Sequence, residues 1–181
     1  MSTSDGATIA TARLLLRPMT AADTDALLGI FGDPNVMAAF NEPTFERPQM
    51  ERWVQRNLDH QAAHGYGLYS VVLKADGLLI GDCGLERMDD AGDRDGAVAE
   101  LGYDFRSDHW NQGYATEAAI AVRDHAFGSL ALPRLISLIR VGNEASRRVA
   151  EKVGMKHVET VERYGRSYWR YGIARDDARG G

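Results

Sequence analysis

Hydrophobic residues in the first third of the chain follow the period of a strand and then the period of helices. Thr20 and Asp23 have the spacing that marks a helix N-terminus, and apolar residues recur at helical intervals from Ala26 to Phe31. Gly65 is suited to end a second, longer amphipathic helix. The predicted elements are a strand at 13–17, a helix over about 20–32, a helical turn and loop at 33–43, and a helix at 47–65.

The remaining chain has mostly the hydrophobic pattern of strands. Asp76-Gly77 predicts a hairpin turn, and the polar, acidic stretch Met88–Gly96 predicts a loop that leads into the next strand. Asn143 and Gly154 are suited to begin and end a helix. The predicted strands are 68–73, 78–85, 97–105, 134–141, 156–162 and 167–174, with a helix after the third and another after the fourth. The order β-α-α-β-β-β-α-β-α-β-β predicts an α/β fold in which helices flank a mixed sheet.

Composition indicates one compact domain over residues 1–181, with loose ends at about 1–9 and 176–181. Of the 181 residues, 44% are hydrophobic and 26% are charged, which is ordinary for a globular protein. A formal net charge of -5 argues against broad nucleic-acid binding, although it leaves room for a local basic pocket. No apolar run is long enough to span a membrane, and residues 1–9 lack the features of a signal peptide.

The cysteine and histidine content limits which disulfide, catalytic thiol and zinc sites the chain can form. The single cysteine, Cys83, excludes an internal disulfide and fits a reducing cytoplasm. It lies in a predicted buried strand, where thiols are usually inert, so a catalytic thiol is the less favoured interpretation. No group of Cys and His has the spacing of zinc ligands.

The stretch from Asp108 to Glu117 joins a predicted strand to a predicted helix through a loop that contains Gly113. The first backbone N–H groups of a helix have no partner within the helix, and together with the helix dipole they can hold phosphate oxygens. Gly113 allows a ligand to approach the backbone closely, and Ala115 keeps a neighbouring position small. The sequence therefore predicts a phosphate site here. The alternative, a glycine that only eases the turn, is about equally compatible with this stretch alone.

Several motifs, in a fixed order, resemble those of the GNAT superfamily of acetyl-CoA-dependent N-acetyltransferases. Within that superfamily the chain is most similar to the RimJ/RimL-type group, which acetylates N-terminal amines of ribosomal proteins and various small amines. The resemblance runs from Thr11 to about Arg175. It rests on TARLLLRP at 11–18, IGDCG at 80–84, AELGY at 99–103, WNQGYATEA at 110–118 and NEASRRVAEKVGM at 143–155.

The resemblance implies how the chain would bind acetyl-CoA. The family fold is a central, mostly antiparallel sheet whose strands splay apart, flanked by helices. Backbone amides of the loop hold the pyrophosphate, the splayed strand binds the pantetheine arm, and Asn143 and Ser146 contact that arm. Asn143 and Ser146 can also be a plain helix cap and a first-turn serine. The implied cofactor residues are Tyr103, Asp104, Phe105, Trp110, Asn111, Gln112, Gly113, Tyr114, Ala115, Thr116, Asn143 and Ser146. The family motif has Gln or Arg where this chain has Trp110, a change usual in the RimJ/RimL-type group.

Acetyl transfer requires a neutral amine, so a group must remove a proton from it. Glu100 is the candidate base: RimJ/RimL-type sequences often carry Glu here, and strand alternation places it on one face with Val98, Gly102 and Asp104. A solvated sheet edge is the alternative setting for Glu100. Glu117, in the first turn of the next helix, is better interpreted as a partner of the helix dipole.

The general acid is less clearly marked in the sequence. Many GNAT enzymes have a tyrosine seven residues after the asparagine, and here that position is Ala150. Ser146 is the best replacement, and a simple contact to the cofactor is its alternative role.

The acceptor is an amine that the sequence does not identify further. Residues 31–45, the acidic loop 89–95 and the segment 164–171 are expected to frame its cleft. A protein N-terminus, an aminoglycoside, a polyamine and an amino acid all remain candidates, and a homodimer remains open. A non-catalytic acyl-CoA-binding module is a rival function. An ATP-binding enzyme is a poorer rival, because the chain lacks the Gly-x-x-x-x-Gly-Lys-Ser/Thr motif.

Overall fold

The computed structural model of the protein describes residues 6–88 and 98–178. Its helices are η1 (Ala21–Asp23), α1 (Thr24–Phe31), α2 (Pro34–Ala38), α3 (Arg47–His64), η2 (Ser107–His109), α4 (Tyr114–Gly128), α5 (Glu144–Lys152) and α6 (Arg175–Ala178). Its strands are β1 (Ile9–Ala10), β2 (Leu14–Pro18), β3 (Leu68–Leu73), β4 (Leu79–Met88), β5 (Val98–Phe105), β6 (Arg134–Arg140), β7 (Lys156–Arg163) and β8 (Arg166–Ala174). The helices flank one mixed sheet, as the sequence predicts.

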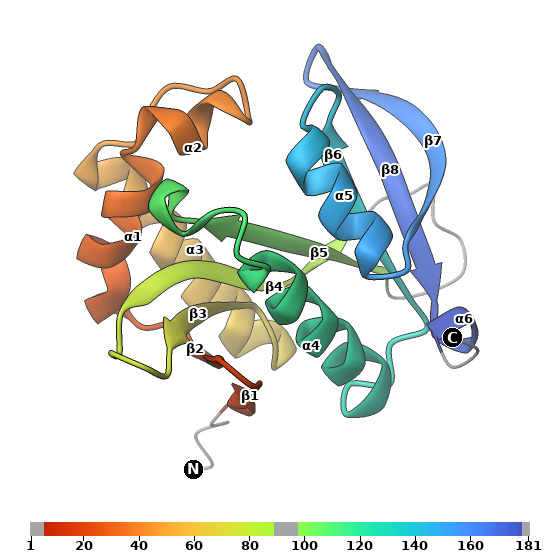
Figure 1. Ribbon diagram of the computed structural model, residues 1–181, viewed down its shortest axis with the longest axis horizontal. Helices are drawn as coiled ribbons and strands as arrows, with labels where there is room; N and C mark the ends of the chain where they lie inside the picture. Colours follow the sequence, from red (N-terminus) through yellow and green to blue (C-terminus); the bar gives the residue numbers. More distant parts are fainter. Residues whose placement is uncertain (1–5, 89–97, 179–181) are drawn as a thin grey trace.

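The described strands form one sheet in the order β1-β2-β3-β4-β5-β6-β8-β7. Every neighbouring pair is antiparallel except β5 and β6, which run parallel. These two strands pair only at the beginning, where Val98–Glu100 lies against Arg134–Ile136. Beyond Glu100 the strands diverge, so the sheet opens in its middle, as Figure 1 shows.

Helices cover both faces of the sheet and define two hydrophobic cores. The larger core lies under α4 and includes Leu85, Leu101 and Val122, all of which are fully or almost fully buried. The smaller core lies on the opposite face, under α1 and α3, and includes Leu27 and Met50. The two cores arise from the alternation of β3, β4 and β5, which turns successive side chains toward opposite helical layers. Figure 1 shows α4 and α5 in front of the sheet and α3 behind it.

The predicted elements agree with the observed ones to within one to three residues at most boundaries, and the differences lie mainly at the ends of the chain. Ile9–Ala10 pairs with β2 as β1, although the sequence predicts loose chain there. Arg175–Ala178 forms the short helix α6 in the stretch predicted as a tail. Residues 1–5 of the expected loose N-terminal end and the acidic loop at 89–95 lie outside the described residues.

Local signals explain where the main helices begin and end. Helix α3 begins with Pro48 in its first turn and ends at Gly65, whose φ of 74° is a left-handed conformation that favours glycine. At α5, the Asn143 side chain accepts a hydrogen bond from the Ser146 amide at 3.2 Å. Within the described ranges no helix combines the length and apolar character that crossing a membrane requires.

Candidate active site

The opening between β5 and β6 begins at a set of side-chain contacts. The Ser137 hydroxyl, which is 2% exposed, donates to the Leu101 carbonyl at 2.7 Å. The Leu138 amide donates to the Glu100 carboxylate at 3.4 Å, which is a long hydrogen bond. Hydrogen bonds that involve side chains thus replace the backbone hydrogen bonds between β5 and β6 at the point where the two strands separate. From Leu101 onward, the edge of β5 that faces β6 is left without strand pairing.

Two cavities meet at this opening. The first has a volume of about 350 Å³ and lies between the sheet and helices α1–α3. The second has a volume of about 380 Å³ and lies between the glycine loop, β5 and α5. Both are lined by Phe40, Tyr103, Asp104, Asn143 and Ser146. A ligand can therefore extend from one cavity into the other along β5.

Most of the predicted cofactor residues line the second cavity. They are Tyr103, Asp104, Phe105, Trp110, Asn111, Gly113, Tyr114, Ala115, Thr116, Asn143 and Ser146. Asn111 and Gly113 have φ values of 59° and 82°, so the loop turns sharply before α4 begins at Tyr114. Gln112 is not part of this lining, and its carbonyl instead accepts a hydrogen bond from Arg13 at 2.9 Å.

The Trp110 side chain has a structural contact that the sequence does not reveal. Its indole N–H donates to the carbonyl of Phe105, the last residue of β5, at 2.9 Å. The side chain is 42% exposed, so the ring remains partly accessible. This bond holds the loop against the end of the strand, and it explains why a tryptophan is compatible with the backbone arrangement of the loop.

Arg13 is a second contributor to the loop that the sequence does not identify. Its guanidinium pairs with Glu117 at 2.7 Å and lies 4.3 Å from the centre of the Tyr114 ring. Glu117 also accepts hydrogen bonds from Thr11, at 2.6 Å, and from the Arg13 amide, at 2.8 Å. Glu117 therefore ties the chain before β2 to the first turn of α4, a stronger structural role than a dipole partner alone.

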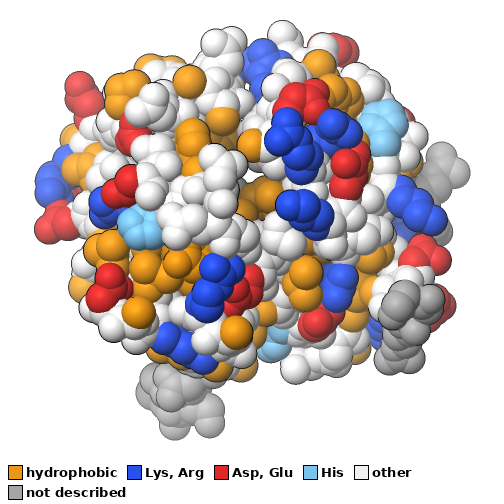
Figure 2. Space-filling model, in the orientation of Figure 1, with side chains coloured by type: hydrophobic (Ala, Val, Ile, Leu, Met, Phe, Trp, Pro, Cys, Tyr) orange, Lys and Arg blue, Asp and Glu red, His pale blue; other side chains and the backbone are white. Residues whose placement is uncertain are grey.

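Basic residues border the second cavity on the α5 side. Arg148 and Lys152 line it directly. Figure 2 shows Lys and Arg side chains gathered over α5, beside a hollow between the two halves of the molecule. This local basic surface exists despite the net charge of -5 of the whole chain. It is suited to a phosphorylated ligand.

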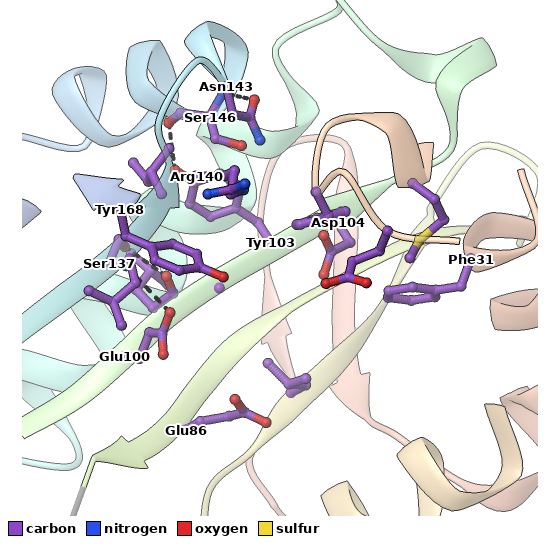
Figure 3. A pocket seen from close by; sticks show the side chains of 18 of the residues that line it. Phe31, Glu86, Glu100, Tyr103, Asp104, Ser137, Arg140, Asn143, Ser146 and Tyr168 are labelled. Carbon is purple, nitrogen blue, oxygen red and sulfur yellow. Dashed lines mark hydrogen bonds between the residues drawn. The ribbon is translucent and has the colours of Figure 1, made fainter. Parts of the chain in front are cut away.

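Glu100 lies on the wall of the first cavity, and Figure 3 shows it at the opening near Ser137 and Tyr168. Burial and the neighbouring charge of Glu86 raise the pKa of Glu100 to about 7, with the Leu138 amide acting in the opposite direction. A carboxyl group with this pKa can accept a proton near neutral pH.

Glu100 is one of four carboxylates on the same face of strands β4 and β5. In the antiparallel register Asp82 lies opposite Asp104 and Glu86 lies opposite Glu100, with a pair of glycines between them. We call these four residues the carboxylate row. Glu86, Glu100 and Asp104 line the first cavity. Asp82 is fully buried and neither of its carboxylate oxygens has a hydrogen-bond partner.

The carboxylate row has unusual electrostatics. Burial raises the pKa of Asp104, and the charge of Glu86 adds to this effect. Burial also raises the pKa of Asp82, with Asp104 and Glu86 contributing. The sequence predicts Glu100 as a catalytic residue and Asp104 as a cofactor contact through its backbone. It does not identify Asp82 or Glu86 as part of the site. The four-residue spacing within each pair, Asp82 to Glu86 and Glu100 to Asp104, is visible in the sequence, but only the strand register brings the two pairs together.

The opposite wall of the first cavity is aromatic. Phe31 packs against Phe45 and Trp53, with ring centroids 5.3 and 5.0 Å apart. Tyr168 enters from β8, with Arg140 5.7 Å from its ring centre. Members of two segments expected to frame an acceptor cleft, 31–45 and 164–171, thus line this cavity. The third expected segment, the loop 89–95, is outside the described residues.

Three further residues bear on the choice of catalytic groups. Cys83 is fully buried, and burial raises the pKa of its thiol, so the thiol stays protonated. Ala150 is fully buried in the larger core. The Tyr103 hydroxyl donates to the Ser146 carbonyl at 2.7 Å, which leaves the Ser146 hydroxyl separate from that bond.

Sequence comparisons relate the chain to bacterial proteins. A family description, acetyltransferase (GNAT) domain, matches residues 13–156. The chain is 35% identical over 159 residues to the uncharacterized protein YkkB of Bacillus subtilis (strain 168), covering 86% of this chain and 89% of that protein. It is 29% identical over 150 residues to the uncharacterized N-acetyltransferase p20 of Bacillus licheniformis, covering 82% of each.

Solved structures share the fold. A GNAT-family acetyltransferase from Bacillus anthracis superposes with a TM-score of 0.78 at 25% identity, covering 94% of this chain and 99% of that one. RimL, a ribosomal L7/L12 α-N-protein acetyltransferase in complex with coenzyme A, has a TM-score of 0.75 at 18% identity, with 95% and 99% coverage. AAC(6')-Ib in complex with ribostamycin and coenzyme A has a TM-score of 0.75 at 17% identity, with 92% and 96% coverage.

Proposed function

Because this chain belongs to the GNAT acetyltransferases, we propose that it transfers an acetyl group from acetyl-CoA to a primary amine by direct attack in a ternary complex. One observation carries this proposal. Two cavities meet at the divergence of β5 and β6, one bordered by a glycine loop and basic residues and the other by carboxylates. A donor in one cavity and an acceptor in the other would meet beside Glu100.

The second cavity fits coenzyme A in its chemistry. The unpaired edge of β5 after Glu100 offers the backbone of Tyr103, Asp104 and Phe105 to the amide groups of pantetheine. The loop and the first turn of α4 offer backbone N–H groups to the pyrophosphate, and Arg148 and Lys152 add positive charge. The complexes of RimL and AAC(6')-Ib with coenzyme A support this assignment by analogy of fold.

Glu100 is the proposed general base. An alkylamine is mostly protonated at neutral pH, since its reference pKa is about 10.4, so the reaction needs a proton acceptor. Glu100 combines a place on the cavity wall with a pKa of about 7. The proton passes from the amine to Glu100, directly or through one water molecule.

The departing thiolate needs a proton, and Ser146 is the proposed donor. Ser146 lines both cavities, so its hydroxyl is available where acetyl-CoA and the amine would meet. Tyr168 is a second candidate, because it lines the first cavity and Figure 3 shows its hydroxyl directed into the opening. Ser146→Ala and Tyr168→Phe separate the two: the variant of the true donor loses kcat, and the other keeps it.

The acceptor is proposed to be a primary amine, with a protein N-terminal amine and small molecules as the two candidate kinds. The RimJ/RimL-type motifs favour the first kind. The fold neighbours include one protein that acts on a ribosomal protein and one that binds an aminoglycoside, so likeness of fold favours neither.

A binding and turnover experiment tests the proposed function. Acetyl-CoA should raise the melting temperature, whereas ATP should leave it unchanged. Thiol release from acetyl-CoA is then measured with a panel of N-terminal peptides, aminoglycosides, oligoamines and amino acids. Acetyl-CoA binding without turnover of any amine would favour the rival function, a non-catalytic acyl-CoA-binding module. Stabilisation by ATP alone would contradict the acetyltransferase proposal.

A further inference from the structure

The carboxylate row extends along the floor of the first cavity instead of forming a single point of negative charge. Glu100 and Asp104 are four residues apart on β5, which corresponds to about 13 Å between their Cα atoms. Gly102 lies between them, and a Cβ atom at this glycine would meet nothing within 4 Å. The floor is therefore open between two ends that carry carboxyl groups.

This arrangement is costly for the protein alone. Carboxylates that face each other across a strand pair repel, and their burial removes the water that would screen them. Within the described residues, the row is not a group of three or more ligands that could hold a metal ion. A single ammonium group placed at one end would leave the other end uncompensated. A ligand with positive charges spaced along an aliphatic chain matches the carboxylate row better.

The arginines of the first cavity have other contacts. Arg166 pairs with Glu42, and Arg140 donates to the Ser167 carbonyl at 3.2 Å. Arg56 reaches the cavity from α3. Across residues 6–88 and 98–178, no ion pair joins any of these arginines to a member of the row. The charge of Arg163 acts on Glu100, whereas in the described ranges the three arginines that line the cavity form no ion pair with Glu86 or Asp104.

The wall opposite the row suits the rest of such a ligand. The rings of Phe31, Phe45 and Trp53 form one packed cluster beside the cavity. Aromatic faces bind methylene groups by burial of apolar surface and bind ammonium groups through the ring quadrupole. The cavity therefore combines spaced carboxylates on one side with aromatic surface on the other.

We propose that the acceptor is a small oligoamine, in which a primary amine reacts beside Glu100 while a further ammonium group on its aliphatic chain is held by the Asp104 carboxylate, at the other end of the carboxylate row. This inference rests on the proposed acetyl transfer. The amine nitrogen forms a bond to the acetyl carbon as the carbon–sulfur bond breaks. Glu100 takes the amine proton and the thiolate of coenzyme A receives one, so the products are a mono-N-acetylated oligoamine and coenzyme A.

Two amines of matched size test this inference. Hexamethylenediamine and heptylamine have the same number of heavy atoms, but only the diamine has a second ammonium group. We expect kcat/KM for the diamine to be about 10–100-fold higher, since a charged hydrogen bond contributes about 1.5–3 kcal/mol. A linear triamine should be at least as good a substrate as the diamine.

Asp104→Asn identifies the source of this preference, since it removes the carboxylate that would hold the second ammonium group and keeps the backbone of the residue. The variant should reduce the ratio of diamine to monoamine kcat/KM about tenfold, and this ratio is the readout because an effect on Glu100 or on acetyl-CoA acts on both amines alike. Glu51→Gln, at an exposed position of α3, is the matched control and should keep the wild-type ratio. Melting temperatures confirm that both variants are folded.

Each outcome has a distinct meaning. Equal kcat/KM for the diamine and the monoamine would overturn the oligoamine inference while leaving the acetyltransferase proposal intact. A preference for N-terminal peptides over every oligoamine would overturn it in favour of a protein acceptor. A diamine preference that survives Asp104→Asn would remove Asp104 from recognition and would overturn the inference. Acetyl-CoA binding with no acetylation of any amine would overturn both proposals.

Discussion

At the scale of single residues, the carboxyl group of Glu100 shows how position sets chemistry. A glutamate on a solvated strand would be ionised throughout the neutral range and would be a weak base. Here burial and the charge of Glu86 raise its pKa to about 7. The group therefore changes protonation state in the pH range where amine acetylation would operate.

Glu100→Gln should lower kcat by roughly 10²–10⁴-fold if Glu100 is the general base. The wild-type kcat/KM should rise with pH through about 7, the pKa of Glu100, as the base ionises. The variant should lack this inflection and should recover part of its activity at high pH, where more amine is neutral.

Calorimetry with acetyl-CoA is the control for this variant, since an unchanged affinity separates lost chemistry from a damaged site. An effect on the KM of the amine with little change in kcat would instead assign Glu100 to acceptor binding. A wild-type rate across the whole pH range would remove Glu100 from the mechanism.

The same residue predicts how stability depends on pH. The pKa of Glu100 is raised in the folded state from 4.5 to about 7, so the folded protein binds this proton more tightly than the unfolded chain does. Its contribution to stability is complete below about 4.5 and is lost as the pH rises through about 7. Glu100→Gln should therefore raise the melting temperature relative to wild type more at pH ~8 than at pH ~4.5.

The expected difference is on the order of 1–3 kcal/mol, allowing for the partial exposure of the side chain. Thermal unfolding at both pH values measures it. Glu51→Gln is the reference for an exposed carboxylate and should show little difference between them. If Glu100→Gln lost stability relative to wild type between the lower and the higher pH, the sign of the pKa shift would be contradicted.

At the scale of elements, the divergence of β5 from β6 depends on contacts that replace strand pairing. Ser137→Ala would leave the Leu101 carbonyl without its buried hydrogen bond, which is 2.7 Å long in the wild type. The expected loss is about 1–3 kcal/mol in the free energy of unfolding.

Denaturant unfolding measures this loss. Ser129→Ala, at an exposed position after α4, should change stability by less than about 0.5 kcal/mol. If Ser137→Ala is no more destabilising than this control, the hydroxyl does not hold the opening.

The connection from β5 to α4 gives a second prediction at this scale. Gly113 has a φ of 82°, a left-handed conformation that a β-branched residue adopts only with strain. A Cβ atom there would lie 3.4 Å from the Arg13 guanidinium and close to the proposed pyrophosphate position. Gly113→Val should weaken acetyl-CoA binding at least tenfold, measured by calorimetry, while the surface position of the loop preserves the fold. Unchanged affinity in a folded variant would place the phosphates elsewhere.

At the scale of the whole molecule, the sheet consists of two parts, which pair in residues 6–88 and 98–178 through three residue pairs of β5 and β6. A ligand placed along β5 and against α5 would connect these parts, as a strand would. Acetyl-CoA should therefore slow amide hydrogen exchange in residues 101–105 and 111–116, measured by mass spectrometry. Strand β7, at the far edge of the sheet, should exchange unchanged. Protection confined to other segments would contradict the proposed position of the cofactor.

The sequence by itself determined the order of elements and much of the cofactor side. Helix signals at Thr20, Gly65 and Asn143 are local, because caps and left-handed glycines depend on a few consecutive residues. The loop around Gly113 could be recognised for the same reason, since its role depends on backbone groups that are neighbours in the chain. The resemblance to acetyltransferases also rested on such continuous motifs.

The acceptor side was decided by tertiary structure. Glu86 and Glu100 are far apart in the sequence, and they become a pair only because antiparallel register places β4 against β5 residue by residue. The raised pKa of Glu100 follows from its burial in the cavity wall and from this pairing, neither of which a local pattern contains. Arg13 reaches the loop near Gly113 for the same kind of reason. Contacts between distant segments depend on how the helices and strands pack, so local sequence patterns did not reveal them.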